Sequence, residues 1–334
     1  MYSLIRSGLV LVLAVAVSVS VTTLPTRAAD GSKALRGRVM DLEAKVAALE
    51  ARLQYMRVEQ GSINGLAGPH VIFEGCNVHL RSGSGNSVDG SVDLVARAPI
   101  EGVVPAGLGN LIIGYDEEPL VGATARGGSH NLVIGPGHNF TSVSGAVIGQ
   151  QNRLTGPMAS VTSGFDNEAS RIGASVSGGL TGKASGKYSS VTGGQNNSAS
   201  ATFTSVNGGS TNLANSGSAS IAGGYKNKAS GDYASVGGGV SNTASAYAAC
   251  VSGGGHNTAS ESTSSVSGGG YNTASNDWST VSGGVENTAA GNSSTVCGGS
   301  HNEATGSYST VGGGYSRTAA GIHDWVAGNL FAEE

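Results

Sequence analysis

A Val or Ile recurs every fifteen residues, eleven times in succession, and the interval never slips. An Ala stands eight positions after each of these residues, and a Gly stands three positions after each of them. The aliphatic column consists of Val161, Val176, Val191, Val206, Ile221, Val236, Val251, Val266, Val281, Val296 and Val311. The Ala column consists of Ala169, Ala184, Ala199, Ala214, Ala229, Ala244, Ala259, Ala274, Ala289, Ala304 and Ala319. Such self-similarity is typical of stacked repeat proteins, in which each unit buries its apolar face only against its neighbours.

The repeat is too short for the helix pairs of helical solenoids, which need about 33 residues or more. Its segments alternate small apolar and polar residues with a period of two, as half-buried strands do, and Gly residues break them. We therefore predict a mainly β fold: a parallel β-roll or β-solenoid with one coil per repeat, regular over residues 161–320. Each coil should rise by about 4.8 Å, the spacing of adjacent strands.

The composition also permits a Gly/Ser-rich disordered linker, because only 5% of the residues are aromatic and 12% are charged. A flexible linker places no demand on where Val falls, so the two unbroken columns favour the folded alternative. One Val and one Ala per coil nevertheless bury little apolar area. We therefore expect several coil stacks to lie side by side and share an inner core.

A heptad pattern precedes the repeats, with apolar residues from Leu35 to Met56 in alternating steps of four and three. It predicts a short parallel coiled coil over residues 33–58, in which Arg38 and Lys45 at g positions face Glu43 and Glu50 at e positions of the next chain. The alternative is one amphipathic helix packed on its own domain. A globular helix face usually has three apolar positions per heptad, and this one has two.

Val at a positions with Leu at d positions leaves two and three strands equally open. Residues 38–43, however, resemble the Arg-apolar-x-x-apolar-Glu trimerisation signature of short coiled coils, and residues 45–50 resemble a version with Lys. A third segment, 52–57, ends in Arg where Glu is wanted. The signature favours a homotrimer, with these residues at the contact: Arg38, Val39, Leu42, Glu43, Val46 and Leu49.

The N-terminal segment, residues 1–29, has the features of an export signal peptide: Arg6, an apolar run from Leu9 to Val21, and a small-residue cleavage site ending at Ala29. An uncleaved membrane anchor is the alternative, but the run is shorter than the ~20 residues of a spanning helix. We expect a mature chain that starts near Ala29 or Asp30 and is secreted or held at the cell surface.

Three further regions are less regular. Residues 61–109 are a transition region with strands, chiefly in 71–80, and residues 110–160 contain longer, more apolar β-solenoid coils. Residues 321–334, with Ile322, Trp325, Val326, Leu330 and Phe331, should interrupt the pattern and cap the open end of the stack.

The three Cys residues should not form a disulfide within the chain. Cys250 and Cys297 lie in different columns three coils apart, at least ~14 Å on the strand spacing. A disulfide requires Cα atoms within about 7 Å. We expect Cys76 to be a buried free thiol, with pairing between chains as the alternative.

The coil Ala146-Val147-Ile148-Gly149 and the turn Asn227-Lys228-Ala229-Ser230-Gly231 resemble the YadA-like head repeats of trimeric autotransporter adhesins, and the likeness extends over residues 110–328. The resemblance implies a trimer of left-handed parallel β-rolls at a bacterial surface that binds host matrix or other cells. Two features differ. The repeats have fifteen residues and Gly-Gly, where adhesin heads have about fourteen residues and Ile-Gly, and the sequence has no C-terminal membrane barrel.

The sequence predicts no catalytic, cofactor-binding or metal-binding residues. Its seven His residues are scattered without a second ligand at metal-binding spacing. Residues 127–131 and 298–302 come nearest to a Gly-x-Ser-x-Gly elbow, but both end in Asn. A formal net charge of -4 without a basic stripe argues against nucleic acid as a partner.

Three classes of function remain. The first is a non-enzymatic, exported, trimeric rod that acts as an adhesin-like or extracellular-matrix structural protein, whose repeated weak contacts with glycans, host matrix or cell-surface molecules add up to avidity. The second is a fibre or spike with a glycan-binding or glycan-cleaving site between chains, and cleavage would need a carboxylate pair. The acidic residues of the repeats are dispersed: Asp166, Glu168, Glu261, Asp277 and Glu286. The third is an ice-binding solenoid with outward Ser and Thr columns, such as Ser175 and Ser177.

Overall fold

The computed structural model describes residues 29–63, 65–115, 117–120 and 122–328. It divides into two compact units, one up to His79 and one from Leu80 onward. The division falls inside the expected transition region, 61–109. The expected export signal lies outside the described residues except for Ala29, and so do Leu330 and Phe331 of the expected cap.

The first unit contains a helix and a pair of strands. Helix α2 spans Ala29–Leu53, and strands β1 (Met56–Glu59) and β2 (His70–Phe73) pair in antiparallel fashion. Within the described residues, no helix is long and apolar enough to cross a membrane.

The helix ends earlier than the heptad pattern predicted. Met56 was expected at the last d position of a coiled coil over residues 33–58, but it begins β1 and pairs with Phe73. Val58 pairs with Val71, and both are β-branched residues that favour strands. The carbonyl oxygen of Tyr55, just before β1, accepts from the amide of Glu74. The heptad pattern on the helix therefore stops at Leu53.

Cys76 follows β2 in a segment without strands, and it is exposed. The expectation of a buried thiol was wrong, because residues 74–80 are exposed throughout and no layer covers them. Cys250 and Cys297 are also free thiols in the structure.

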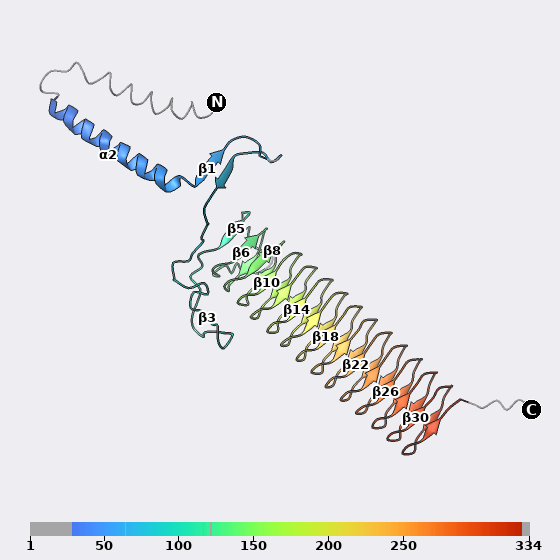
Figure 1. Cartoon of the computed structure of the whole chain (residues 1–334). Helices are drawn as coiled ribbons and strands as arrows, with labels where there is room; N and C mark the ends of the chain where they lie inside the picture. Colours follow the sequence, from blue (N-terminus) through green and yellow to red (C-terminus); the bar gives the residue numbers. More distant parts are fainter. Residues whose placement is uncertain (1–28, 64, 116, 121, 329–334) are drawn as a thin grey trace, which may run out of the picture. The chain divides into compact units, whose positions relative to one another are not determined.

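The second unit is a parallel β-solenoid of about thirteen turns (Figure 1), which confirms the fold predicted from the fifteen-residue interval. Alternate strands join two parallel sheets, one of 15 and one of 13 strands. The longer sheet contains β5 (Leu111–Ile113), β6 (Leu132–Ile134), β8 (Ala146–Ile148), β10 (Ser160–Val161), β12 (Ser175–Val176), β14 (Ser190–Val191), β16 (Ser205–Val206), β18 (Ser220–Ile221), β20 (Ser235–Val236), β22 (Cys250–Val251), β24 (Ser265–Val266), β26 (Thr280–Val281), β28 (Thr295–Val296), β30 (Thr310–Val311) and β32 (Trp325–Val326).

The shorter sheet contains β7 (Asn139–Phe140), β9 (Arg153–Leu154), β11 (Glu168–Ala169), β13 (Lys183–Ala184), β15 (Ser198–Ala199), β17 (Leu213–Ala214), β19 (Lys228–Ala229), β21 (Thr243–Ala244), β23 (Thr258–Ala259), β25 (Thr273–Ala274), β27 (Thr288–Ala289), β29 (Glu303–Ala304) and β31 (Thr318–Ala319). A separate antiparallel pair, β3 (Val92–Asp93) and β4 (Ala98–Pro99), precedes the coils.

Residues fifteen apart lie one above another in both sheets. Val161 pairs with Val176, and Ala169 pairs with Ala184, and the same register continues to the last coils. Every member of the aliphatic column is at most 1% exposed, and every member of the Ala column is 0% exposed. The two columns point inward from opposite sheets and form one continuous core.

A buried ladder of Asn side chains completes this core. Asn212 is typical: its Nδ2 donates to the carbonyl oxygens of Gly208 and Gly224, both at 2.9 Å, and its Oδ1 accepts from the amide of Asn227 at 2.9 Å. All the polar groups of the amide are thus used inside the coil, as burial requires. The Val and Ala columns therefore need no neighbouring stack to remove them from water, contrary to the expectation of a shared core.

The turn that follows each aliphatic residue requires Gly. Gly194, three residues after Val191, has φ = 83°, and a Cβ placed there would lie 2.0 Å from the carbonyl oxygen of Gly209 in the next coil. No residue with a side chain fits this stack of turns.

The first coils differ in length and in their core. Leu111 pairs with Leu132, 21 residues later, and Leu132 pairs with Ala146, 14 residues later. Phe140 and Leu154 occupy the positions in the shorter sheet that Ala fills further on, and both are at most 2% exposed. Larger side chains therefore fill the base of the solenoid.

The last described coil continues the stack. Residues 321–334 were expected to interrupt the pattern, but Trp325 and Val326 form β32 and pair with β30 at the fifteen-residue register. Val326 lies fifteen residues after Val311 and packs against the core, so it extends the aliphatic column by one member.

Candidate functional site

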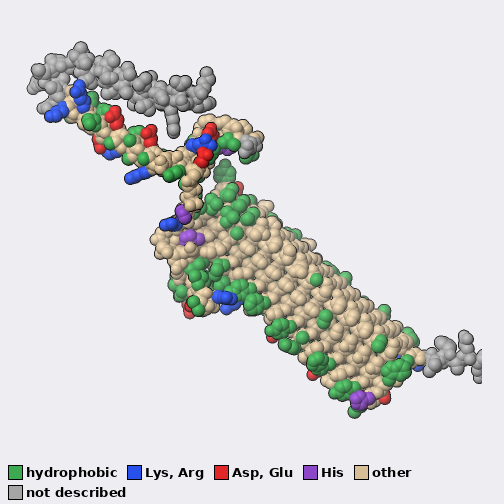
Figure 2. Space-filling model, viewed as in Figure 1, with side chains coloured by type: hydrophobic (Ala, Val, Ile, Leu, Met, Phe, Trp, Pro, Cys, Tyr) green, Lys and Arg blue, Asp and Glu red, His purple; other side chains and the backbone are tan. Residues whose placement is uncertain are grey.

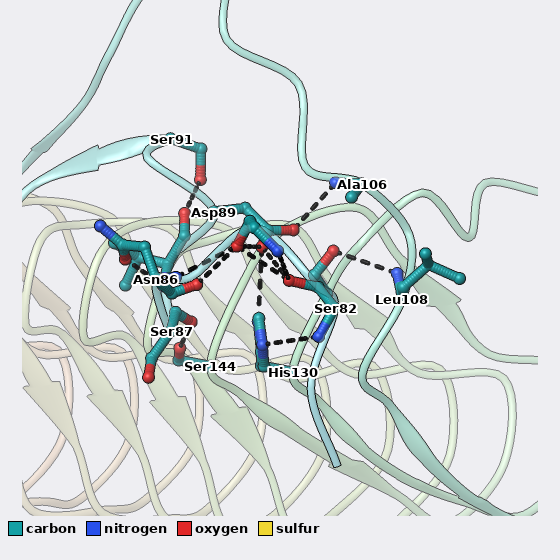
Figure 3. A network of polar contacts seen from close by, with 12 residues as sticks. Ser82, Asn86, Ser87, Asp89, Ser91, Ala106, Leu108, His130 and Ser144 are labelled. Carbon is teal, nitrogen blue, oxygen red and sulfur yellow. Dashed lines mark hydrogen bonds and ion pairs between the residues drawn. The ribbon is translucent and has the colours of Figure 1, made fainter.

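In the polar loop before the first coils, the carboxylate of Asp89 is buried (Figure 3). The Asp89 side chain is 3% exposed. Its Oδ1 accepts hydrogen bonds from the Ser82 and Ser84 hydroxyls, both at 2.5 Å, and its Oδ2 accepts from the amide of Ala106 at 2.9 Å. The carboxylate thus joins three parts of the loop.

Burial by itself raises the pKa of Asp89, but the hydrogen bonds outweigh it. Hydroxyl groups of Ser129, Ser82 and Ser84 and the amide of Ala106 all stabilise the anion, and together they hold the pKa of the carboxyl well below its usual range. Asp89 is therefore an anion at neutral pH and cannot act as a general acid there.

His130 lies beside this carboxylate on the coil between β5 and β6. Its Nε2 accepts a hydrogen bond from the amide of Ser82 at 3.3 Å, so in the neutral ring the proton is on Nδ1. Nδ1 lies 3.8 Å from Asp89 Oδ1 and makes no hydrogen bond. The neighbouring Ser129 Oγ accepts from the amide of Gly107 at 2.8 Å.

Ser, His and Asp side chains meet here, but not as a hydrolytic relay. In such a relay the His accepts the proton of the nucleophilic hydroxyl and the carboxylate orients the His. Here the hydroxyl groups of Ser82 and Ser84 donate to the carboxylate itself, and His130 is bound to a backbone nitrogen. The arrangement ties the loop to the first coils.

The sequence alone did not indicate this cluster. Residues 127–131 were interpreted as a chance match to a nucleophile elbow, and the structure places Ser129 and His130 of that segment in the Asp89 network. Asp89 itself was missed. The available signal was an Asp in a Ser-rich loop, Ser82 to Asp89, which is a common self-bonding arrangement.

Two of the carboxylates considered for glycan cleavage face basic side chains of a neighbouring coil. Asp166 Oδ1 lies 3.7 Å from Arg153 Nη1, and Glu286 Oε2 lies 2.6 Å from His301 Nε2. Arg153 and Asp166 line an open hollow of about 370 Å³ with Thr181, Lys183 and three further polar residues. Ligand pockets are mostly apolar and enclosed, so this hollow is a gap between polar side chains.

No group of three or more His, Cys, Asp or Glu side chains among the described residues could hold a metal ion.

The rod has two turn edges, and both contain residues with positive φ. On one edge these residues form the column from Met158 to His323, and on the other they form the column from Gln151 to Ser316. We define the aromatic edge by five exposed side chains on or beside the first column: Phe203, Tyr233, Tyr247, Trp278 and Tyr308. They are 56–63% exposed, and Figure 2 shows separated hydrophobic groups along one long edge of the rod.

Some rings of this edge touch their neighbours in the next coil. Tyr188 stacks on Phe203 with centroids 5.5 Å apart, and Tyr233 meets Tyr247 edge to face at 5.6 Å. Tyr188 also packs on the base of the rod, against the cluster that includes Val88.

The residues predicted to hold a trimer together all lie on α2. Leu42, Val46 and Leu49 are 52–58% exposed, and Val39 is half-buried. Arg38 and Glu43 are exposed as well. Lys45 binds Asp41 of the same helix at 2.6 Å.

Comparison of the sequence with protein-family models and with curated proteins found no match.

Proposed function

We propose that this chain is a non-enzymatic, exported rod that assembles as a homotrimer through a parallel coiled coil of α2 and acts as an adhesin-like or extracellular-matrix structural protein. The observation that carries this proposal is the contrast between the two units. The solenoid buries its own core, whereas the apolar heptad positions of α2 other than the half-buried Val39 are about half exposed, from 48% at Leu53 to 58% at Leu42. Three helices packed in parallel would cover these side chains.

The coil stack suits a role in extended contact. In the regular coils Ser or Thr precedes the buried aliphatic residue in every coil except that of Cys250, so a weak contact with this polar column is repeated along the rod and again in each copy. The resemblance to YadA-like heads and the predicted export signal support a place at the cell surface. The 14-residue coils between Leu132 and Ser160 match the coil length of that family more closely than the later ones do.

Native mass measurement of the full chain tests the assembly, with three chains as the expected result. Leu42→Asp with Leu49→Asp should give monomers that keep a folded solenoid, because these d positions face the other helices. Ala44→Asp with Ala51→Asp, at f positions of the same helix, is the matched control and should leave the trimer intact. A wild-type chain that stays monomeric at micromolar concentration contradicts the proposal.

An adhesion assay on matrix proteins and cells tests the role, and binding should be stronger for the trimer than for the monomeric variant. An ice-recrystallisation assay addresses the third class of function. The outward columns beside Val mix Ser and Thr with Ala222, Gly237 and Cys297, which disfavours the regular array that an ice surface needs.

A further inference from the structure

We propose that the aromatic edge binds an extended, uncharged polysaccharide whose chain runs along the rod. This inference rests on the adhesive function proposed above and names the class of ligand. It begins from the backbone at the exposed rings.

Four of the five rings stand on backbone that bulky residues rarely adopt. The φ angles of Phe203, Tyr233 and Tyr308 are 59°, and that of Trp278 is 61°. This left-handed region is unfavourable for large side chains, so a ring at such a turn position is costlier than a small residue. The turn itself does not need a ring, because Ser293 in the same column has the same conformation, with φ = 53°.

Phe203, Tyr233 and Tyr308 each touch one neighbouring ring, that of Tyr188, Tyr247 or His323. Beyond these contacts the five rings bury little surface, because each is more than half exposed. The position of these rings is therefore better explained by a ligand that binds to the aromatic edge. A row of Tyr and Trp rings offers flat apolar surfaces with a polar end, as binding surfaces commonly do.

The spacing of the rings fits a chain of sugars. Phe203 and Tyr233 are two coils apart, and so are Trp278 and Tyr308, which corresponds to about 10 Å at the spacing of adjacent strands. Two pyranose rings of an extended β-1,4-linked chain cover a similar length. The C–H groups on one face of a pyranose pack on an aromatic ring, and the hydroxyl groups around its rim remain free for hydrogen bonds.

Polar groups lie between the rings to meet those hydroxyls. Asp232, beside Tyr233, is one of them. Its Oδ1 accepts hydrogen bonds from the Ser216 hydroxyl at 2.5 Å and from the Gly217 amide at 2.8 Å. Fixed acceptors of this kind give orientation at low entropic cost. The contact regions of protein interfaces, in contrast, are depleted in Ser and Asp, so a second copy of the chain fits this edge less well.

Charge selects among the polysaccharides. The turn positions of this edge hold Arg171 and Lys187 in the two coils before Phe203. From Ser216 to His323, where the other four rings lie, they include Asp232, Glu261 and Asp277 and neither Lys nor Arg. Sulfated glycans and polyuronates would be repelled. The ligand class is therefore neutral glycans.

Titration of the full chain with soluble β-1,4-linked glucose and N-acetylglucosamine oligomers of increasing length tests the inference, with heparin as the sulfated comparison. Affinity should increase with length until the oligomer spans several rings. Trp278→Ser should weaken binding about tenfold or more, as loss of a central aromatic contact does. Tyr271→Ser is the matched control: Tyr271 has φ = 57° and is 59% exposed, but it lies on the opposite edge, so binding should stay within about twofold.

Unchanged affinity in Trp278→Ser, or a preference for heparin, overturns the inference, and so does loss of the trimer in this variant, since the edge would then contact another copy. Because Ser already occupies this column at Ser218 and Ser293, the variant should have the same melting temperature as the wild type. If the full chain adheres to cells but binds no neutral oligomer, this inference fails and the adhesive function stands. If the trimer adheres to nothing, the proposed function itself fails.

Discussion

The regular coils from residue 161 onward and the base from residue 80 to residue 160 reach stability by different routes. In the regular coils, small residues repeat and each coil uses the same hydrogen bonds as the next, with Val, Ala and Asn columns inside. In the base, large side chains such as Phe140 and Leu154 fill the core, and a buried carboxylate fixes a loop. A repeat needs only local rules, whereas the first coil has no preceding coil and requires contacts that are specific to it.

The largest expected effect concerns the inside and outside of the regular coils. Val236→Asp would bury an unpaired charge at a position that is 1% exposed, and should destabilise the adjoining coils by about 4 kcal/mol or more. Ser235→Asp, the neighbouring residue on the outer face, should be tolerated. Thermal melting and amide hydrogen exchange measure both variants, and equal effects would contradict the assignment of the two faces.

Removal of one rung of the Asn ladder should come next. Asn242→Ala removes the side-chain hydrogen bonds to the carbonyl oxygens of Gly238 and Gly254 and from the amide of Asn257. We expect a cost of about 2–4 kcal/mol, although the Gly254 oxygen still accepts from the amide of Val240. Asn207→Ala, at an exposed position, should change the melting temperature little. If the two variants melt alike, the ladder does not stabilise the core.

A smaller effect, confined to the base, is expected for Asp89→Asn. Because the folded pKa of Asp89 lies below its unfolded value of about 3.9, its contribution to stability is present above that value and is lost as the pH falls toward the folded pKa. In the variant, the loop around residue 89 should therefore unfold more easily at pH 7. The stability of the base should depend less on pH below about 4. Hydrogen exchange should increase in residues 80–130 and stay unchanged in the regular coils, and uniform changes would show that the two regions are not independent.

The smallest effect should be a gain in stability. Gly182 takes the place of Asn in the ladder, and its amide donates a hydrogen bond to Asn167 Oδ1 at 2.7 Å, as the amides of the Asn residues do. Its φ is not positive, so Gly182→Asn should restore the missing rung and raise stability by about 1 kcal/mol. Gly194→Asn should instead destabilise, because a Cβ there meets the backbone of the next coil. Calorimetry of the two variants measures these changes in the free energy of unfolding. A loss of stability in Gly182→Asn would contradict the role of the Asn ladder.

The coil stack could be predicted because its rule is local and repeated. A slip of one residue would exchange the inner and outer faces, so an unbroken Val column specifies the register of every strand. The interval extends to Val326, which pairs with Val311 although it was predicted, with Ile322 and Trp325, to interrupt the pattern. For the register of the strands, the fifteen-residue interval therefore predicts better than the composition of a single segment.

The Asn ladder, the Asp89 network and the aromatic edge were not predicted, each for a physical reason. Asn beside Gly usually indicates an exposed turn, and nothing in one repeat shows that its amide points inward. Asp89 is bonded to Ser82 and Ala106 and lies beside His130, so its partners are spread over 48 residues of irregular sequence. The rings recur only in some repeats, which makes their column visible only once the coils are aligned.

Because each coil contacts only its neighbours and does so at one fixed register, whole repeats are interchangeable. Unequal recombination that duplicates or deletes one repeat would rejoin two coils with unchanged hydrogen-bond partners, while an insertion of any other length would shift every column beyond it. The reach of this molecule can therefore evolve in discrete steps, with its two ends inherited intact.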